Sequence, residues 1–247
     1  MKLGIIGTGN VGCACAMAAA IRGSAREIVL VNRTRKTAEA VATDIRYGIP
    51  LGRKVDIVDG DYDALNGAGV ILITSGVNEK TGGATDRNDP RGRLKLLDKN
   101  AAIYRDIVPE IVAAAPNAVL VAVTDPPDPL ADVAREAGKG ATVLSAGTFL
   151  DSQRFRVHLG RYFDVDPAHV EAQVVGDHGT SQVFLWSSAR IGGVLVSTLL
   201  KRRDETVDVG RWGIIEVLEP EMSEEERQRL QKSADTLQAA LASLAKS

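Results

Sequence analysis

Residues 7–12 read Gly-Thr-Gly-Asn-Val-Gly and stand between the apolar stretch Leu3–Ile6 and an alanine-rich stretch that ends at Gly23. The first stretch predicts a strand and the second predicts a helix. In such a strand–loop–helix context, the first glycine permits the tight turn, the second lets the backbone approach a pyrophosphate, and the third lets the helix pack closely on the strand. The N-terminus of the helix then faces the anion. The stretch therefore predicts a dinucleotide site.

Further apolar runs rich in β-branched residues recur up to Ser145, and most are separated by stretches long enough for a helix. Near-continuous apolar strands that alternate with helices are typical of a parallel sheet covered on both faces. We therefore predict an α/β fold, with a doubly wound Rossmann domain over residues 1–146. The predicted strands are Leu3–Ile6, Glu27–Val31, Val55–Val58, Val70–Thr74, Val119–Val123 and Thr142–Ser145, and the predicted helices are Cys13–Gly23, Lys36–Tyr47 and Arg93–Ala115.

The pattern changes after Ser145, and residues 147–247 predict a second, α+β domain. A helical stretch follows Thr148, and a terminal helix begins at Ser223, where Ser223 and Glu226 have the spacing of a capping box. Between these helices lie the strand-like stretches Glu171–Val175 and Gly213–Val217 and the apolar stretch Val183–Ile191. In the first domain, residues 75–92 are rich in Gly, Asp and Asn and predict a long, functional loop.

The composition excludes several classes of protein. A formal net charge of -2 over 247 residues gives no basic surface for nucleic acid. No apolar run approaches the roughly twenty residues that cross a bilayer, and we expect no membrane partner. Cys13 and Cys15 are too close in sequence to form a disulfide framework, which favours a reduced, cytoplasmic protein. They have no neighbouring ligands at metal spacing, so we expect no metal site.

The end of the second predicted strand bears on the choice of cofactor. A carboxylate normally stands there and binds the adenosine ribose 2′-hydroxyl, but this chain has Asn32. Asn32 does not repel a 2′-phosphate, and the neighbouring Arg33 and Arg35 offer it positive charge, so the cofactor is NAD or NADP, with NADP favoured. Alternatively, the two arginines are solvated residues at a helix start. The predicted cofactor-binding residues are Gly7, Gly9, Asn10, Val11, Gly12, Asn32, Arg33, Arg35, Thr74 and Gly76.

Two later motifs carry a resemblance to a known family. Residues 147–156 read GTFLDSQRFR and residues 175–181 read VGDHGTS. Together with the glycine loop, they make the chain similar to the lactate/malate dehydrogenase family, the L-2-hydroxy acid dehydrogenases, whose signatures read G-T-x-L-D-S-x-R and G-[DE]-H-G-x-S. The likeness extends to residues 213–218 and 232–235. It implies an NAD(P)-dependent oxidoreductase that interconverts a small L-2-hydroxy acid, of the lactate or malate type, and its 2-oxo acid, and that forms a dimer or tetramer.

The resemblance also implies residue roles. His178 is the acid/base that exchanges a proton with the substrate oxygen, since histidine titrates near neutral pH. Asp151 fixes its tautomer, Arg154 binds the substrate carboxylate, and Arg93 polarises the carbonyl from a mobile loop. The alternative is that Asp151 and Arg154 form a surface ion pair and that His178 is a turn residue.

The chain departs from the family pattern at three places. Asp125 stands where the family has an asparagine that donates to the substrate oxygen, and a carboxylate donates only when protonated. The loop of residues 75–92 is longer than in the family, with apparent extra length at residues 78–86. Counted back from Arg93, Arg87 falls where malate-preferring members bind a second carboxylate, although Arg91 could serve as readily. Between Val196 and Gly213 only a short stretch remains of several dozen family residues, which predicts a shortened substrate domain. The alternative function is therefore a dinucleotide-binding family member with impaired or no catalysis.

Overall fold

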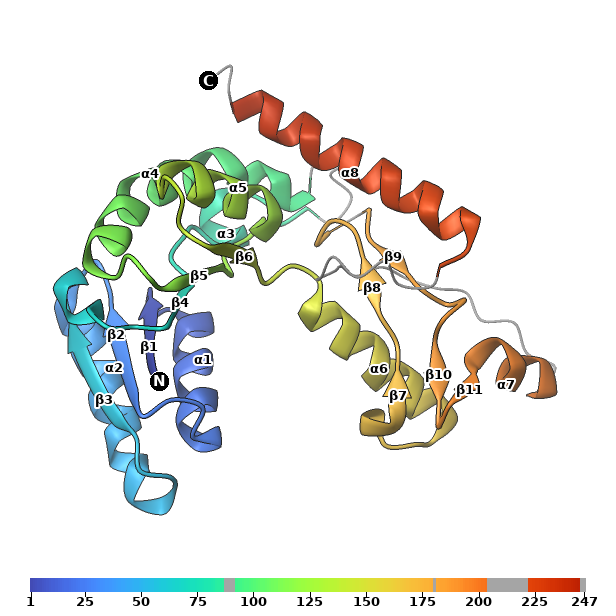
Figure 1. The fold of residues 1–247 in the computed structure, drawn as a ribbon, viewed down its shortest axis with the longest axis horizontal. Helices are drawn as coiled ribbons and strands as arrows, with labels where there is room; N and C mark the ends of the chain where they lie inside the picture. The colour runs from blue at the N-terminus through green and yellow to red at the C-terminus, as the bar shows by residue number, and fades with distance from the viewer. Residues whose placement is uncertain (87–91, 180, 204–221, 245–247) are drawn as a thin grey trace. The chain divides into compact units, whose positions relative to one another are not determined.

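Six short apolar strands form one parallel sheet in the order β3-β2-β1-β4-β5-β6 (Figure 1). The computed structural model describes residues 1–86, 92–179, 181–203 and 222–244, and the chain divides into two compact units. The first unit comprises residues 1–85 and 95–145, and the second comprises residues 86–94 and 146–247. The strands are β1 (Lys2–Ile6), β2 (Glu27–Val31), β3 (Asp56–Gly60), β4 (Val70–Ile73), β5 (Val119–Ala122) and β6 (Val143–Ser145).

All six predicted strands are confirmed to within two residues at each end. The central strand β1 pairs in parallel with both β2 and β4, so that Ile5 lies opposite Leu30 and Leu72. Ile5 and Leu30 are completely buried, as expected where helices cover both faces of a sheet. This strand order, with its reversal between β1 and β4, is that of the predicted dinucleotide-binding fold.

Helices cover the sheet, and two of them were missed by the sequence patterns. Figure 1 shows α1 and α2 beside β1–β3, and α4 and α5 beside β5 and β6. The missed helices are α5, which has Pro127 in its first turn, and α3, a single turn inside the predicted loop 75–92. The helices and 3-10 turns of this part are α1 (Asn10–Arg22), α2 (Arg35–Gly48), η1 (Ile49–Leu51), η2 (Tyr62–Leu65), α3 (Glu79–Gly82), η3 (Gly92–Leu96), α4 (Leu97–Ala114) and α5 (Pro127–Ala137).

The second unit contains small antiparallel sheets and three helices among its described residues. The strand β10 pairs with β7 and β11, and β8 pairs with β9, so the predicted strand Glu171–Val175 is in fact divided into β7 and β8. The predicted strand Gly213–Val217 lies outside the described residues. The elements are α6 (Phe149–Phe163), η4 (Pro167–His169), β7 (Val170–Glu171), β8 (Val174–Val175), β9 (Val183–Phe184), β10 (Arg190–Ile191), β11 (Val194–Leu195), α7 (Val196–Arg203) and α8 (Glu224–Leu244).

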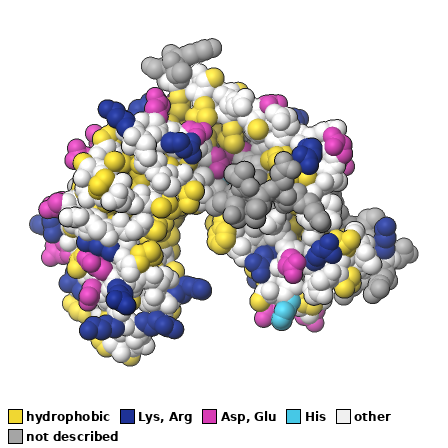
Figure 2. All heavy atoms as spheres, viewed as in Figure 1, with side chains coloured by type: hydrophobic (Ala, Val, Ile, Leu, Met, Phe, Trp, Pro, Cys, Tyr) yellow, Lys and Arg dark blue, Asp and Glu magenta, His cyan; other side chains and the backbone are white. Residues whose placement is uncertain are grey.

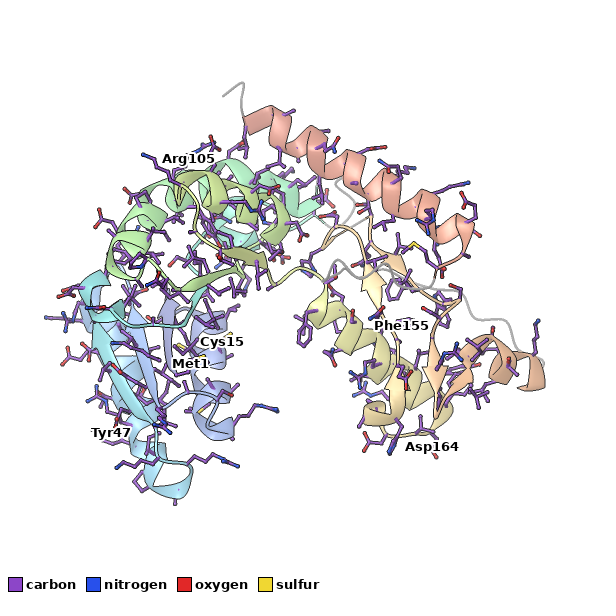
Figure 3. All side chains as sticks on the ribbon, in the orientation of Figure 1. Met1, Cys15, Tyr47, Arg105, Phe155 and Asp164 are labelled. Atoms are coloured by element: carbon purple, nitrogen blue, oxygen red, sulfur yellow. The ribbon has the colours of Figure 1, made fainter. Side chains whose placement is uncertain are left out.

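Aromatic packing and a helix cap organise this unit. Phe155 of α6, labelled in Figure 3, packs edge-on against Phe184 and Trp186, with ring centroids 4.9 and 4.8 Å away.

The predicted capping box at the start of α8 is confirmed, because the Ser223 N–H donates to Glu226 and the Glu226 N–H donates to Ser223 Oγ. Burial raises the pKa of Glu226, but hydrogen bonds from Ser187 and Ser223 outweigh it and leave this pKa below its ordinary value.

The surface matches the near-neutral composition. On the face drawn in Figure 2, both basic and acidic side chains appear over the first unit, and dark-blue Lys and Arg side chains are the more numerous at its lower end. Within the described ranges, no helix is both long and apolar enough to cross a membrane. No cluster of three or more metal-ligating side chains occurs among the same residues.

Candidate functional site

Close packing explains two of the three glycines in the loop at the carboxyl end of β1. Gly7 has a φ of +95°, and a Cβ there would lie 2.8 Å from the Ser75 backbone nitrogen. A Cβ on Gly12 would lie 1.9 Å from the Gly7 carbonyl oxygen. Thr74 at the end of β4 holds the same turn, since its hydroxyl donates to the Gly7 carbonyl at 2.8 Å. These contacts set the turn that leads from β1 into α1.

Gly9 has a different reason to be glycine. A Cβ built on Gly9 would meet no described atom within 4 Å, so packing in the protein does not require its small size. Gly9 is also the N-cap of α1, and among the described side chains none caps this helix. The Thr8 hydroxyl oxygen beside it is buried and has no hydrogen-bond partner in the described chain. Open space, uncapped N–H groups and an orphaned hydroxyl together fit a bound pyrophosphate.

The loop is joined to the end of β2 through Asn32. The Asn32 amide oxygen accepts a hydrogen bond from the Thr8 N–H at 3.2 Å, and its amide nitrogen donates to the Thr34 carbonyl. Asn32 therefore lies where the sequence predicts the adenosine ribose contact. Asn10 and Val11 are exposed at the start of α1, and the Val11 side chain is 54% exposed.

Arg35 is already engaged by acidic neighbours. Its guanidinium lies 3.1 Å from an Asp59 carboxylate oxygen and 2.9 Å from one of Asp61. The hydrogen bonds that Arg35 donates to Asp59 and then to Asp61 raise the pKa of Arg35. Arg33 is exposed. Of the two arginines expected to meet a 2′-phosphate, Arg35 would have to give up these carboxylates first.

A buried asparagine, missed by the sequence analysis, joins the ends of β4 and β5. Asn100 of α4 is completely buried, accepts from the Val77 N–H at 2.7 Å and donates to the Asp125 carbonyl oxygen at 2.7 Å. Gly76 fits tightly against it, because a Cβ there would lie 2.8 Å from the Asn100 amide oxygen. Asn100 follows the charged Asp98 and Lys99 in the sequence, so nothing in the local pattern sets it apart from a surface residue. The backbone that carries Asp125 is thus held from a second element.

The second unit brings together three of the predicted catalytic and substrate-binding residues. The His178 Nδ1 atom lies 2.6 Å from Asp151 Oδ2, and Arg154 Nη1 lies 2.7 Å from Asp151 Oδ1. Asp151 is fully buried and His178 is 8% exposed, whereas the Arg154 side chain is 42% exposed. One carboxylate therefore binds the imidazole with one oxygen and the guanidinium with the other.

Helix α6 explains why Asp151 can be buried as a carboxylate. Asp151 lies in the first turn of α6, where the helix dipole favours negative charge, and Arg154 follows three residues later on the same face. Charge-assisted hydrogen bonds offset the cost of burying the anion. Of the three histidines, all of which the structure describes, only His178 is buried, while His158 and His169 are exposed.

The remaining predicted residues are distributed as follows. Asp125 is half-buried in the first unit, three residues after the end of β5. Arg87 and its alternative Arg91 lie outside the described residues. Arg93 lies in η3, but its side chain is outside what the structure describes.

Comparison with known proteins identifies related chains. Residues 1–143 match the family model "lactate/malate dehydrogenase, NAD binding domain", and residues 148–208 match "lactate/malate dehydrogenase, alpha/beta C-terminal domain". The L-lactate dehydrogenase of Chloroherpeton thalassium is 45% identical over 205 residues, covering 82% of this chain and 65% of the relative. That of Thermus aquaticus is 43% identical over 205 residues, covering 82% and 64%. The chain thus spans slightly less than two thirds of the length of these relatives.

Solved structures of low sequence identity share the fold. The malate dehydrogenase of Cryptosporidium parvum superposes with a TM-score of 0.88 at 22% identity, covering 100% of this chain and 99% of that one. MGS-M5, a lactate dehydrogenase from a Medee basin deep-sea metagenome library, gives a TM-score of 0.82 at 24% identity, covering 99% and 98%. The predicted α/β fold class is confirmed.

Proposed function

The chain belongs to the lactate/malate dehydrogenase family, and from this premise we propose that it interconverts a small L-2-hydroxy acid and its 2-oxo acid with a nicotinamide cofactor. The observation that carries the proposal is the Asp151 carboxylate, which bonds the His178 imidazole at 2.6 Å and the Arg154 guanidinium at 2.7 Å. A proton donor and a cation held by one buried acid suit a substrate that has a reactive carbonyl next to a carboxylate.

The proton chemistry follows from the pairing of His178. An ionised carboxylate can only accept hydrogen bonds, so Asp151 fixes the ring proton on Nδ1 and leaves Nε2 to exchange a proton with the substrate oxygen. Reduction consumes one proton, which the imidazolium delivers, and the buried negative charge of Asp151 stabilises that imidazolium beforehand. The bound cofactor supplies or accepts the hydride. The protein's own part is to hold and move the proton at Nε2.

Arg154 is proposed to bind the substrate carboxylate. A guanidinium presents a planar fork of donors that matches a carboxylate in a two-point contact, and lysine cannot reproduce this geometry. The 42% exposure of the Arg154 side chain leaves it accessible to a solute. Its pairing with Asp151 fixes the guanidinium at a set distance from the imidazole, which orients the carbonyl of a bound 2-oxo acid.

We propose NAD as the cofactor, held by residues 7–12 and Asn32. The match of residues 1–143 to an NAD binding domain supports this choice. The expectation of NADP needed positive charge from Arg33 and Arg35, but Arg35 is paired with Asp59 and Asp61. These two carboxylates would also oppose a 2′-phosphate.

The Asn32→Asp variant tests the adenosine contact. The new carboxylate keeps the acceptor for the Thr8 N–H, gains an acceptor for a ribose hydroxyl and repels a 2′-phosphate, so the ratio of kcat/KM with NADPH to that with NADH falls by roughly 10-fold. Initial rates with both cofactors measure it. Asn117→Asp, at an exposed turn, is the matched control. An unchanged ratio would remove Asn32 from the cofactor site.

For the substrate, we propose a monocarboxylate of the lactate type. The curated relatives at 45% and 43% identity are named L-lactate dehydrogenases, which supports it. The malate alternative depends on a second cation, for which Arg87 and Arg91 are the two candidates. Relative kcat/KM values for pyruvate and oxaloacetate decide between the two.

The Asp125→Asn variant tests the departure from the family pattern. An amide can donate to the substrate oxygen without being protonated and carries no charge against an anionic substrate, so kcat/KM for the 2-oxo acid rises by about 10-fold. Asn100 holds the backbone of residue 125 through its carbonyl, so the change affects the side chain alone. Asp132→Asn, on exposed α5 surface, is the control. A fall in kcat/KM would mean that the carboxylate itself takes part.

The direct test of the proposed function combines binding with turnover. We expect NADH to bind the full chain and to be oxidised when pyruvate, oxaloacetate or a longer 2-oxo acid is added. Tight NADH binding without oxidation by any of these acids would instead support the dinucleotide-binding protein that lacks catalysis. The assembly state, proposed as a homo-oligomer, is checked in the same samples by light scattering.

A further inference from the structure

A serine of the C-terminal helix bonds the turn that carries His178. Ser233 of α8 is completely buried, and its hydroxyl accepts a hydrogen bond from the Asp177 N–H at 2.6 Å. The Ser181 hydroxyl donates to Asp177 Oδ2 at 3.1 Å and lies 3.2 Å from Ser233 Oγ. Backbone and side chain of the residue directly before His178 are thus both held by serines.

Gly176 shows how closely helix and turn fit. It has a φ of +100°, a conformation that residues with a side chain rarely adopt, and a Cβ there would lie 2.6 Å from Ser233 Oγ. The chain therefore reverses directly against the Ser233 hydroxyl. Because Asp177 is 4% exposed, its N–H has little access to water as a substitute partner if that hydroxyl is removed.

Helix α8 holds the same segment at a second point. Glu226, two helical turns before Ser233 and thus on the same face, accepts hydrogen bonds from the N–H and the hydroxyl of Ser187. Between them, Leu230 packs against Val183 and its neighbours. The helix thus fixes the segment on both sides of β9.

We propose that Ser233 is a positioning residue for His178, an inference that rests on the proposed role of His178 as the acid/base. Ser233 acts on His178 through one residue, because its hydroxyl bonds the Asp177 N–H and His178 is the next residue in the chain. The 2.6 Å contact between Nδ1 and Asp151 Oδ2 demands a precise ring position. Helix α8 contributes none of the predicted catalytic groups, but through Ser233 it sets the position of the catalytic imidazole.

The test compares Ser233→Ala with Ser243→Ala, the same change at an exposed position of the same helix, in the full chain. One readout is the ring ¹⁵N chemical shifts of His178, which report the share of protons on Nδ1 and need no substrate. The other is the separation of kcat from KM. For Ser233→Ala we expect ring shifts displaced from the Nδ1–H tautomer, kcat lower by roughly 10- to 100-fold and KM within about twofold. Ser243→Ala should match the wild type in both.

The outcomes separate this inference from the proposed function. Wild-type ring shifts in a folded Ser233→Ala protein overturn the positioning role, whatever happens to kcat. A second outcome combines displaced ring shifts in Ser233→Ala with a wild-type chain that fails to oxidise NADH with any 2-oxo acid tested. That outcome would end the proposed function and leave the positioning of the ring by Ser233 intact. Should Ser233→Ala fail to fold, Ser233→Cys keeps a side chain of similar size but offers the Asp177 N–H a much weaker acceptor. Ring shifts unchanged in a folded Ser233→Cys protein overturn the inference, and displaced shifts support it.

Discussion

The His178→Gln variant is expected to lose kcat by roughly 1,000-fold while its dissociation constant for NADH stays within about twofold of wild type. Positioned proton transfer contributes roughly 10²–10⁴ in rate, and glutamine cannot donate a proton at neutral pH. The residues proposed to bind the dinucleotide, 7–12, belong to the first unit, whereas His178 belongs to the second, so the substitution leaves the proposed cofactor contacts in place. Steady-state kinetics and a fluorescence titration of NADH measure the two quantities.

The chain provides its own controls for this experiment. His158→Gln and His169→Gln make the same chemical change at exposed histidines of the second unit and should leave kcat within about twofold. A His178→Gln enzyme that keeps more than about a tenth of wild-type kcat would show that another group supplies the proton.

A second large effect is expected for Asp151→Asn. The amide has nearly the volume of the carboxylate but can donate to Nδ1, which moves the ring proton to Nε2 and leaves the wrong tautomer for proton acceptance from the alcohol. We expect kcat for hydroxy-acid oxidation to fall by about 10³–10⁴, as when a carboxylate that orients a catalytic histidine is replaced by an amide. The pair between the buried residue 151 and the partly exposed Arg154 also weakens, since the guanidinium loses its anion.

The control for Asp151→Asn lies at the other end of α6. Asp164 is the exposed C-cap at a φ of 55°, where asparagine is readily accommodated, so Asp164→Asn should change neither kcat nor folding. Comparing the thermal unfolding of the two variants separates lost stability from lost chemistry. A stably folded Asp151→Asn enzyme with kcat within tenfold of wild type would contradict the assigned role.

The sequence predicted the Rossmann sheet because its central strands β1 and β2 are buried over almost their whole length and therefore read as unbroken apolar runs. It missed α5, whose early prolines read as helix breakers although proline suits the first helical turn. It also missed α3, whose cap is formed by Asn78 and Thr81 and is not the Ser/Glu pattern found at Ser223. In both helices the residues that favour the helix start are present in the sequence, but α5 is unusual in its prolines and α3 is only one turn long.

Some features of the candidate site could be predicted from the sequence and others could not. Asp151, Arg154 and His178 could be proposed from their motifs, and the structure brings their side chains together. The pairing of Arg35 with Asp59 and Asp61 could not be foreseen, since the partners lie on a separate strand and turn. Asn100 and Ser233 went unnoticed for a related reason. A polar residue inside a helix shows its purpose only when the distant backbone N–H or carbonyl that it binds is known.

The most direct test of the central claim is a crystal structure of the chain with NADH and oxamate, an unreactive isostere of pyruvate. The account predicts the oxamate carbonyl oxygen within ~2.6–3.2 Å of His178 Nε2 and its carboxylate in a two-point contact with Arg154. The Nδ1 contact with Asp151 should persist. Oxamate bound away from Arg154, or an imidazole whose Nε2 faces no ligand atom, would contradict the assignment of His178 as the group that moves the proton.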